Sequence, residues 1–239
     1  MPAQIMALIF DLETIGENYD ELDETTQSVL TRWIKREAKS DSEYEVALKD
    51  IKEGLGFSPL TGEIVAIGVL DSETKIGAVY FQAPGEKHEF EEDGFKYRSM
   101  GEKEMLEKFW ELANKYQEFV SFNGRGFDVP YLFVRSAVHL IRPTKDLMSN
   151  RYLSSQRFNA KHIDLLDQLS FYGASQRKGS LHLYCRAFGV ESPKIGGVQG
   201  DDVAGLFKEK EFVTIARYNR RDLFATLGVY NHWRNFLEF

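Results

Sequence analysis

Residues 6–14 read MALIFDLET, a short apolar run that ends in two carboxylates. The stretch Met6–Leu12 combines branched and aromatic side chains, which is typical of a buried β-strand. Side chains two apart on a strand share a face, so we expect Asp11 and Glu13 side by side at the end of this strand. Adjacent carboxylates repel each other unless a cation such as Mg²⁺ or Mn²⁺ lies between them. Taken alone, D-x-E is common, and two solvated charges are the simpler interpretation.

The composition is that of a globular protein. The chain has 239 residues, 43% of them hydrophobic and 28% charged, which excludes disordered, collagen-like and disulfide-rich classes. No apolar run approaches the roughly 18 residues of a membrane helix, and the start of the chain is too short for a signal peptide. The single cysteine, Cys185, cannot form an internal disulfide. We therefore expect a soluble, cytoplasmic protein with no membrane partner.

The charge is unevenly distributed. The net charge of −7 argues against a general nucleic-acid coat protein. Acidic residues are in excess over residues 1–138, whereas basic residues are in excess over residues 139–239, so one half could still hold an anionic polymer. Between His139 and Lys161, cations alternate with aromatics as in single-strand binding surfaces, although a polar surface loop is the simpler interpretation. These residues are Arg142, Lys145, Arg151, Tyr152, Arg157, Phe158 and Lys161.

Strand and helix patterns alternate along the rest of the chain. The charged stretch Glu17–Glu53 has patches of helical spacing, which predict a helical insertion at about residues 17–55. Two or three strands followed by alternating helices and strands favour one mixed sheet with helices on its faces, an α/β fold in a single domain over residues 1–239. Strands are predicted at Ile64–Leu70 and Ile76–Phe81, as a hairpin, and at Phe119–Phe122 and His162–Leu166. Helices are predicted after a capping box at Ser99 and Glu102, from Pro130 to about His139 or Leu140, and at Leu181–Phe188, Val203–Lys208 and Phe212–Phe236.

Two further motifs carry carboxylates. Residues 123–130 read NGRGFDVP and place Asp128 between a strand and a helix, where aspartate is also an ordinary N-cap. Residues 218–222 read YNRRD, so Tyr218 and Asp222 share one face of the last helix. A half-buried tyrosine and an ion-paired aspartate would explain this second motif equally well. Each motif alone is explained by the simpler structural interpretation.

The three motifs in this order resemble the signature of the DEDD exonucleases. The tyrosine of YNRRD resembles that of the DEDDy branch, to which the proofreading domains of family B DNA polymerases belong. The wording DLET, NGRGFDVPYL and YNRRD is most similar to stand-alone predicted 3′–5′ exonucleases related to that domain. The resemblance runs from about Ala7 to Val229, apart from the insertion, and it implies a ribonuclease-H-like fold. In that fold the first strand is central and the last helix packs over it.

The resemblance also implies a metal site. Asp11, Glu13, Asp128 and Asp222 would surround two divalent ions, Mg²⁺ or Mn²⁺, that act on a phosphodiester. By analogy Asp11 bridges both ions, Glu13 and Asp222 hold the ion that activates the attacking water, and Asp128 holds the other. Tyr218 would position this water with its hydroxyl, because a tyrosine is poorly suited to act as a strong base at neutral pH.

Substrate contacts follow from the same resemblance. Thr14 would bind near the terminal nucleotide, and Asn123 and Phe127 would contact the penultimate one, although Phe127 fits a core position equally well. We expect Asp164 to cap a helix or to support a ligand rather than to be a fifth ligand. The five histidines have no ligand spacing, which argues against zinc.

The implied reaction is hydrolysis of single-stranded nucleic acid from its free 3′ end, with release of nucleoside 5′-monophosphates. DNA is the expected substrate because of the likeness to polymerases, and an exoribonuclease is the alternative because ribonuclease-D-like relatives share the tyrosine branch. A catalytically silent binding module of the same fold stays open, although all four carboxylates and Tyr218 are present. A ribonuclease-H-like endonuclease is disfavoured by the second and third motifs.

Overall fold

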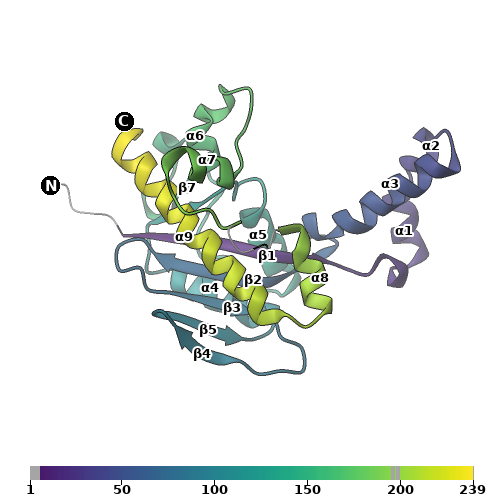
Figure 1. The fold of residues 1–239 in the computed structure, drawn as a ribbon, viewed down its shortest axis with the longest axis horizontal. Coiled ribbons are helices and arrows are strands. Elements are labelled where there is room, and N and C mark those ends of the chain that lie inside the picture. The colour runs from purple at the N-terminus through teal and green to yellow at the C-terminus, as the bar shows by residue number, and fades with distance from the viewer. Residues whose placement is uncertain (1–5, 195–196, 198–199, 239) are drawn as a thin grey trace.

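One mixed sheet forms the centre of the protein. The structure is a computed structural model that describes residues 6–194, 197 and 200–238. Within these residues the strands are β1 (Ala7–Gly16), β2 (Gly62–Asp71), β3 (Gly77–Phe81), β4 (Glu89–Glu92), β5 (Phe95–Ser99), β6 (Glu118–Ser121) and β7 (Lys161–Asp164). Their order across the sheet is β4-β5-β3-β2-β1-β6-β7 (Figure 1). β1 pairs antiparallel with β2 and parallel with β6, so the first strand of the chain is an interior strand.

Helices cover both faces of this sheet, which confirms the predicted α/β class and the ribonuclease-H-like arrangement. One face packs against α9 (Phe212–Phe236), and the other packs against α4 (Glu102–Ala113) and α5 (Asp128–Val138). The remaining α-helices of the described residues are α1 (Glu24–Thr31), α2 (Ile34–Glu37), α3 (Asp41–Gly54), α6 (Leu165–Leu169), α7 (Leu181–Phe188) and α8 (Val203–Lys208). Short 3₁₀ turns are η1 (Tyr19–Glu21), η2 (Leu55–Phe57), η3 (Leu153–Ser155), η4 (Phe158–Ala160), η5 (Phe171–Gly173) and η6 (Gly200–Asp202).

Alternate residues of β1 supply the two cores. Ile9 joins the apolar cluster beneath α9, whereas Phe10 joins the cluster on the other face. The rings of Phe10 and Phe109 meet edge to face at a centroid distance of 5.5 Å. This alternation follows from the two-residue repeat of a strand and makes β1 the element that both helical layers share.

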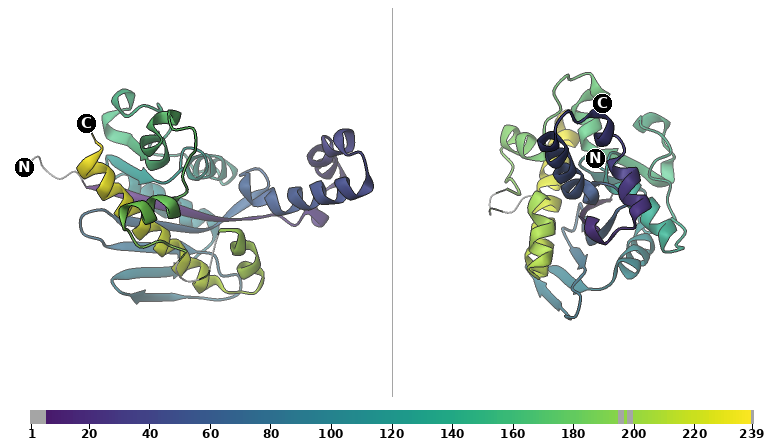
Figure 2. Two further views of the ribbon diagram at one scale, coloured as in Figure 1. Left: turned by 45° about the horizontal axis from the view of Figure 1, so that its top comes forward. Right: turned by 90° about the vertical axis from the view of Figure 1, so that its right-hand side faces the viewer.

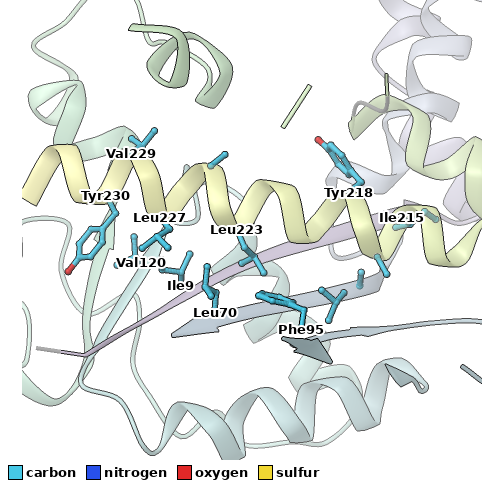
Figure 3. Close-up of a cluster of buried hydrophobic side chains, with 14 of the residues drawn as sticks. Ile9, Leu70, Phe95, Val120, Ile215, Tyr218, Leu223, Leu227, Val229 and Tyr230 are labelled. Carbon is cyan, nitrogen blue, oxygen red and sulfur yellow. The ribbon is translucent and has the colours of Figure 1, made fainter. Parts of the chain in front are cut away.

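The last helix, α9, crosses one face of the sheet (Figures 1 and 3). Ile215, Leu223 and Leu227 are spaced by multiples of four and form a buried stripe along it. In Figure 3, Leu223 and Leu227 point from the helix toward the strands, whereas Tyr218 points away from them. Among the described residues no helix, including the 25-residue α9, is both long and apolar enough to cross a membrane.

The predicted insertion is helical and projects from the sheet (Figure 1; Figure 2, left). We call residues 19–57, from η1 to η2, the arm. Asp23 caps α1 by accepting from the amide of Thr26, and Ser40 caps α3 by accepting from the amide of Glu43. No residue of α3 is buried. Thr31 and Ile34 are buried in α1 and α2, so the arm is held by helix caps, by these few buried side chains and by its attachment at η2.

The first strand is longer than the sequence predicts. β1 continues to Gly16 because β2 stays paired with it, as in the pair Ile15–Glu63. Pairing with β6 ends at Ile9, and the register with β2 shifts between Glu13 and Thr14. The prediction that Asp11 and Glu13 end the strand is therefore wrong. They lie inside β1, just beyond the part that β6 covers.

The predicted capping box is also wrong, although α4 itself is confirmed. Gly101 is the N-cap and provides no side-chain bond. Ser99 ends β5, and the Glu102 carboxylate accepts from the amide of Ile64 at 2.8 Å and pairs with Arg135 at 2.7 Å. Partners far along the chain satisfy this carboxylate better than its own helix end does.

Other boundaries differ by a few residues. The hairpin of β2 and β3 and the span of α9 are confirmed. The predicted strand His162–Leu166 is too long, because the chain turns into α6 at Leu165. β4, β5 and α6 are not predicted from the sequence, since each is only four or five residues long.

Candidate active site

Three carboxylates from the two ends of the chain meet above the sheet. Asp11 and Glu13 come from β1 and Asp222 comes from α9, and one oxygen of each lies within 4.8 Å of the others. They share this place because β1 is interior to the sheet and α9 packs across it. Within the described residues this is the group of acidic, histidine and cysteine side chains that could hold a metal ion.

Asp128 lies beside this cluster. It is the first residue of α5, and its Oδ1 accepts from the amide of Leu12 at 3.0 Å, between the two acids of β1. The N-cap of α5 is Phe127, so Asp128 is not the ordinary cap that its sequence position suggested. Its charge contributes to raising the pKa values of both Asp11 and Glu13, although Asp128 is not one of the three acids that could share an ion.

Burial disfavours the charged forms of all four acids, and repulsion by neighbouring carboxylates adds to this at Asp11, Glu13 and Asp128. The pKa values of Asp11 and Glu13 lie well above their ordinary values, first because of burial and then because of the charge on Asp222. Burial raises the pKa of Asp128 to about 7 and that of Asp222 to about 6. Buried carboxylates of this kind need a cation or a proton, and an all-oxygen set suits Mg²⁺ or Mn²⁺. The residues therefore fit divalent ions.

Asn219 orients Asp11, and it was not predicted from the sequence. Its Nδ2 donates to Oδ2 of Asp11 at 2.8 Å and to the carbonyl of Asp11 at 3.2 Å. Gly68 pairs with Asp11 in the sheet, and a Cβ there would lie 1.9 Å from Oδ1 of Asn219, so only glycine leaves room for α9. One feature of the sequence could have indicated Asn219. It lies on the same stripe as Ile215 and Leu223, where a polar residue interrupts an apolar helix face.

Tyr218 lies next to the carboxylates on α9. It is 8% exposed and its hydroxyl donates to Asp222. Burial and the nearby charge of Asp222 raise the pKa of Tyr218, so its phenol stays protonated. The guanidinium of Arg221 lies 5.7 Å from the centre of the Tyr218 ring. Arg221 was not predicted as part of the site, and its charge lowers the pKa of Asp222.

A cavity of about 720 Å³ adjoins the cluster at Glu13. Thr14 lines it, and its hydroxyl donates to the carbonyl of Gly56 in the arm at 2.7 Å. Phe127 also lines the cavity while its ring packs 5.0 Å from that of Tyr131, so it is both a core residue and a wall residue. The other walls come from the arm, from η6 and from α8, through Asp50, Glu53, Phe57, Gly200 and Ala204.

Asn123 lies in the loop that precedes α5, and Asp164, the last residue of β7, holds that loop. Asn123 has a φ of 63° and is exposed, and it is not among the residues that line this cavity. Asp164 accepts from the amides of Asn123 at 3.0 Å and Arg125 at 2.9 Å, and it caps α6 through the amide of Leu166. The expectation that Asp164 is a helix cap is confirmed, and it also holds the loop that leads to Asp128.

The basic segment from 139 to 161 is a surface loop with two short 3₁₀ turns. Arg151 pairs with Asp167, and Lys145 donates to the carbonyl of Asn159. Tyr152 and Phe158 are exposed. Part of the positive charge in this segment is therefore used within the loop and its neighbours.

Comparison with protein families identifies the chain. Residues 63–237 match the family described as a predicted 3′–5′ exonuclease related to the exonuclease domain of PolB. The chain belongs to this family. The matched part of this exonuclease includes Asp128, Tyr218 and Asp222, whereas Asp11, Glu13 and the arm precede it.

A solved structure shares the fold of this exonuclease. The family B DNA polymerase from the hyperthermophilic archaeon Pyrobaculum calidifontis is similar with a TM-score of 0.61 and 16% identity, over 99% of this chain and 25% of the polymerase chain. The exonuclease thus spans a quarter of the length of that polymerase, and at this identity the likeness concerns the fold. Comparison with curated proteins finds no match.

Proposed function

We propose that this family member is a metal-dependent 3′–5′ exonuclease that removes nucleoside 5′-monophosphates from the 3′ end of single-stranded nucleic acid, with DNA preferred to RNA. The observation that carries this proposal is the meeting of Asp11, Glu13 and Asp222, with one oxygen of each within 4.8 Å, beside a cavity of about 720 Å³. A cavity of this volume is within the range of small-ligand sites.

The four acids would hold two ions, Mg²⁺ or Mn²⁺. Asp11, Glu13 and Asp222 form the central set, and Asp128 adds a carboxylate from the side of α5. The chemistry expected of divalent ions in such a set is to lower the pKa of a water and to offset the charge of a phosphodiester. Burial raises the pKa of every one of the four acids, and the positive charge of Arg221 only partly offsets this at Asp222, which supports a role for bound cations.

Asn219 and Tyr218 are proposed to orient the carboxylates and the attacking water. Asn219 holds one oxygen of Asp11 in place by its amide hydrogen bond. Tyr218 keeps its proton, so we assign it the positioning of the attacking water rather than the removal of a proton. Its hydrogen bond to Asp222 ties this phenol to the carboxylate cluster.

Thr14 is the proposed contact of the terminal nucleotide and Phe127 of the penultimate one, because both line the cavity that reaches Glu13. Asn123 stays a proposed contact of the penultimate nucleotide from the exposed loop before α5. A free, buried thiol at Cys185 agrees with a reducing compartment, and we keep the cytoplasm as the proposed location.

A time course on 5′-labelled single strands tests the proposal. A DNA oligonucleotide and its RNA counterpart are incubated with Mg²⁺, Mn²⁺ or EDTA, with the Asp222→Asn variant as a control whose fold is checked by circular dichroism. We expect a metal-dependent ladder that shortens by one nucleotide from the 3′ end, faster for DNA. Faster loss of RNA would indicate an exoribonuclease, internal cuts an endonuclease, and intact label with a folded protein a silent binding module.

A further inference from the structure

We infer that Phe57, at the base of the arm, stacks on a nucleobase of the single strand, so that the arm completes the substrate site. This inference rests on the proposed function and assigns it a residue. Phe57 precedes the stretch that matches the exonuclease family, residues 63–237. The contact is therefore argued from this chain alone.

Phe57 is an aromatic side chain left in water beside the candidate active site. It is 67% exposed, and it lines the cavity that Glu13 and Thr14 also line. An exposed large apolar side chain gains stabilisation when a ligand covers it. Its place in the wall of a cavity that adjoins the carboxylates indicates the nucleic acid as this ligand.

The backbone next to Phe57 is clamped to the core. The carbonyl of Gly56 accepts from Oγ1 of Thr14 at 2.7 Å and from the hydroxyl of Tyr131 at 2.5 Å. A Cβ on Gly16 would lie 2.7 Å from the amide nitrogen of Gly56, so β1 and η2 touch backbone to backbone. Leu55 is 3% exposed and anchors the same turn. Phe57 is thus presented from a braced turn, which reduces the entropy lost on binding.

A second aromatic lines the same cavity. Phe127, the N-cap residue of α5, packs its ring against that of Tyr131. The hydroxyl of Tyr131 in turn donates to the carbonyl of Gly56, next to Phe57. Bases stack on aromatic side chains with little regard to sequence. Two aromatics from different elements give the cavity two such surfaces.

The charges nearby favour a base over a phosphate at this wall. Asp50 and Glu53 of α3 line the cavity with Phe57 and are exposed, and Glu53 pairs with Lys49 at 3.6 Å. The negative charge of Asp50 repels the phosphate backbone, whereas a neutral base is not repelled. A base that stacks on Phe57 must also leave its partner strand, which accounts for a preference for single strands.

The test compares Phe57→Ala with Leu60→Ala. Leu60 is a matched control, because it is 77% exposed in the next turn and does not line the cavity. Hydrolysis is measured on a 5′-labelled DNA strand and on the same strand with abasic units at its two 3′-terminal positions. We expect Phe57→Ala to raise KM by about 5- to 150-fold with kcat nearly unchanged, and Phe57→Trp to restore it. Leu60→Ala should match the wild type.

The abasic strand separates stacking from a structural effect. If Phe57 stacks on a base, Phe57→Ala and wild type should have similar KM values on this strand. An unchanged KM of Phe57→Ala on the normal strand, or an equal loss on both strands, would overturn the inference while leaving the exonuclease activity intact. If the wild type does not cleave, fluorescence anisotropy of the labelled strand in EDTA and in Ca²⁺ gives the same comparison as Kd. The activity proposal then fails, and the Kd ratio of Phe57→Ala to wild type still decides the role of Phe57.

Discussion

The helix α9 and the arm are stabilised in opposite ways. α9 buries side chains from Phe212 to Trp233 and has no side-chain cap, whereas α3 buries none and begins at the capping residue Ser40. Burial against distant strands holds α9, whereas the arm is held by capping hydrogen bonds and by a few buried side chains of its own, Thr31, Ile34 and Leu55. Three of the four candidate metal ligands, Asp11, Glu13 and Asp222, lie on β1 and α9, and the arm contributes exposed side chains near its base. The candidate metal ligands and the proposed base contact thus lie in regions that are stabilised differently.

The largest contrast concerns two acids beside one cavity. Asp11→Asn should lower hydrolysis by about 10³-fold or more, because it removes a member of a set that acts as a unit. Glu53→Gln in the arm should change the rate only a few-fold, since its charge is exposed and screened. Initial rates on a labelled strand in Mg²⁺ measure both. Comparable losses in the two variants would contradict the division of roles between β1 and the arm.

Stability should show the next largest difference. Leu223→Ala removes a fully buried side chain between α9 and the sheet and should lower the free energy of unfolding by about 2–5 kcal/mol. Val46→Ala in α3, at a position 60% exposed, should change it by about 0.5 kcal/mol or less. Urea titrations followed by circular dichroism measure both values. A loss at Val46 as large as that at Leu223 would show that packing, rather than local hydrogen bonding, stabilises α3.

Metal removal should destabilise the protein in a pH-dependent way. The pKa values of Asp128, about 7, and Asp222, about 6, lie above their ordinary value of 3.8. Below about pH 4 these acids are protonated in both the folded and the unfolded state, so they change the free energy of unfolding little. As the pH rises toward 7, the unfolded chain releases these protons first, so the metal-free folded state loses stability. Mg²⁺ binds the ionised acids and should restore about 2.7 kcal/mol at a hundredfold excess over Kd.

Thermal unfolding at pH 5, 6, 7 and 8 in EDTA or Mg²⁺ measures this effect. The gap in Tm should widen with pH for the wild type and shrink in Asp11→Asn. A gap that stays constant with pH would mean that the cluster does not exchange protons for metal.

The smallest effect should be local to the arm. Ser40→Ala removes the hydrogen bond to the amide of Glu43, at 3.2 Å, and should cost α3 about 1 kcal/mol. Hydrogen exchange should speed up in α3 and stay unchanged in α9. Faster exchange in both helices would show that the arm and α9 unfold together.

Long periodic segments were predicted well from the sequence. The observed boundaries of the β2–β3 hairpin and of α9 lie within a few residues of those that their apolar patterns indicate. This agreement follows because the apolar side chains that make up each pattern are the ones that pack into the core. β4 and β5 were missed because short strands show too little alternation, and β4 is strongly acidic at Glu89–Glu92. The capping box at Ser99 failed because Glu102 finds Arg135, a partner that local spacing does not reveal.

The order of three short motifs was enough to indicate the family and the four acids, because the chemistry depends on residue types that can be read directly. The meeting of Asp11 with Asp222, the fit of Asn219 over Gly68 and the placing of Phe57 beside Thr14 required the folded chain. Each joins segments far apart in the sequence, and side-chain periodicity carries information only about neighbours along one element. The register of β1 against β2 and the packing of α9 across them decide which of these side chains meet.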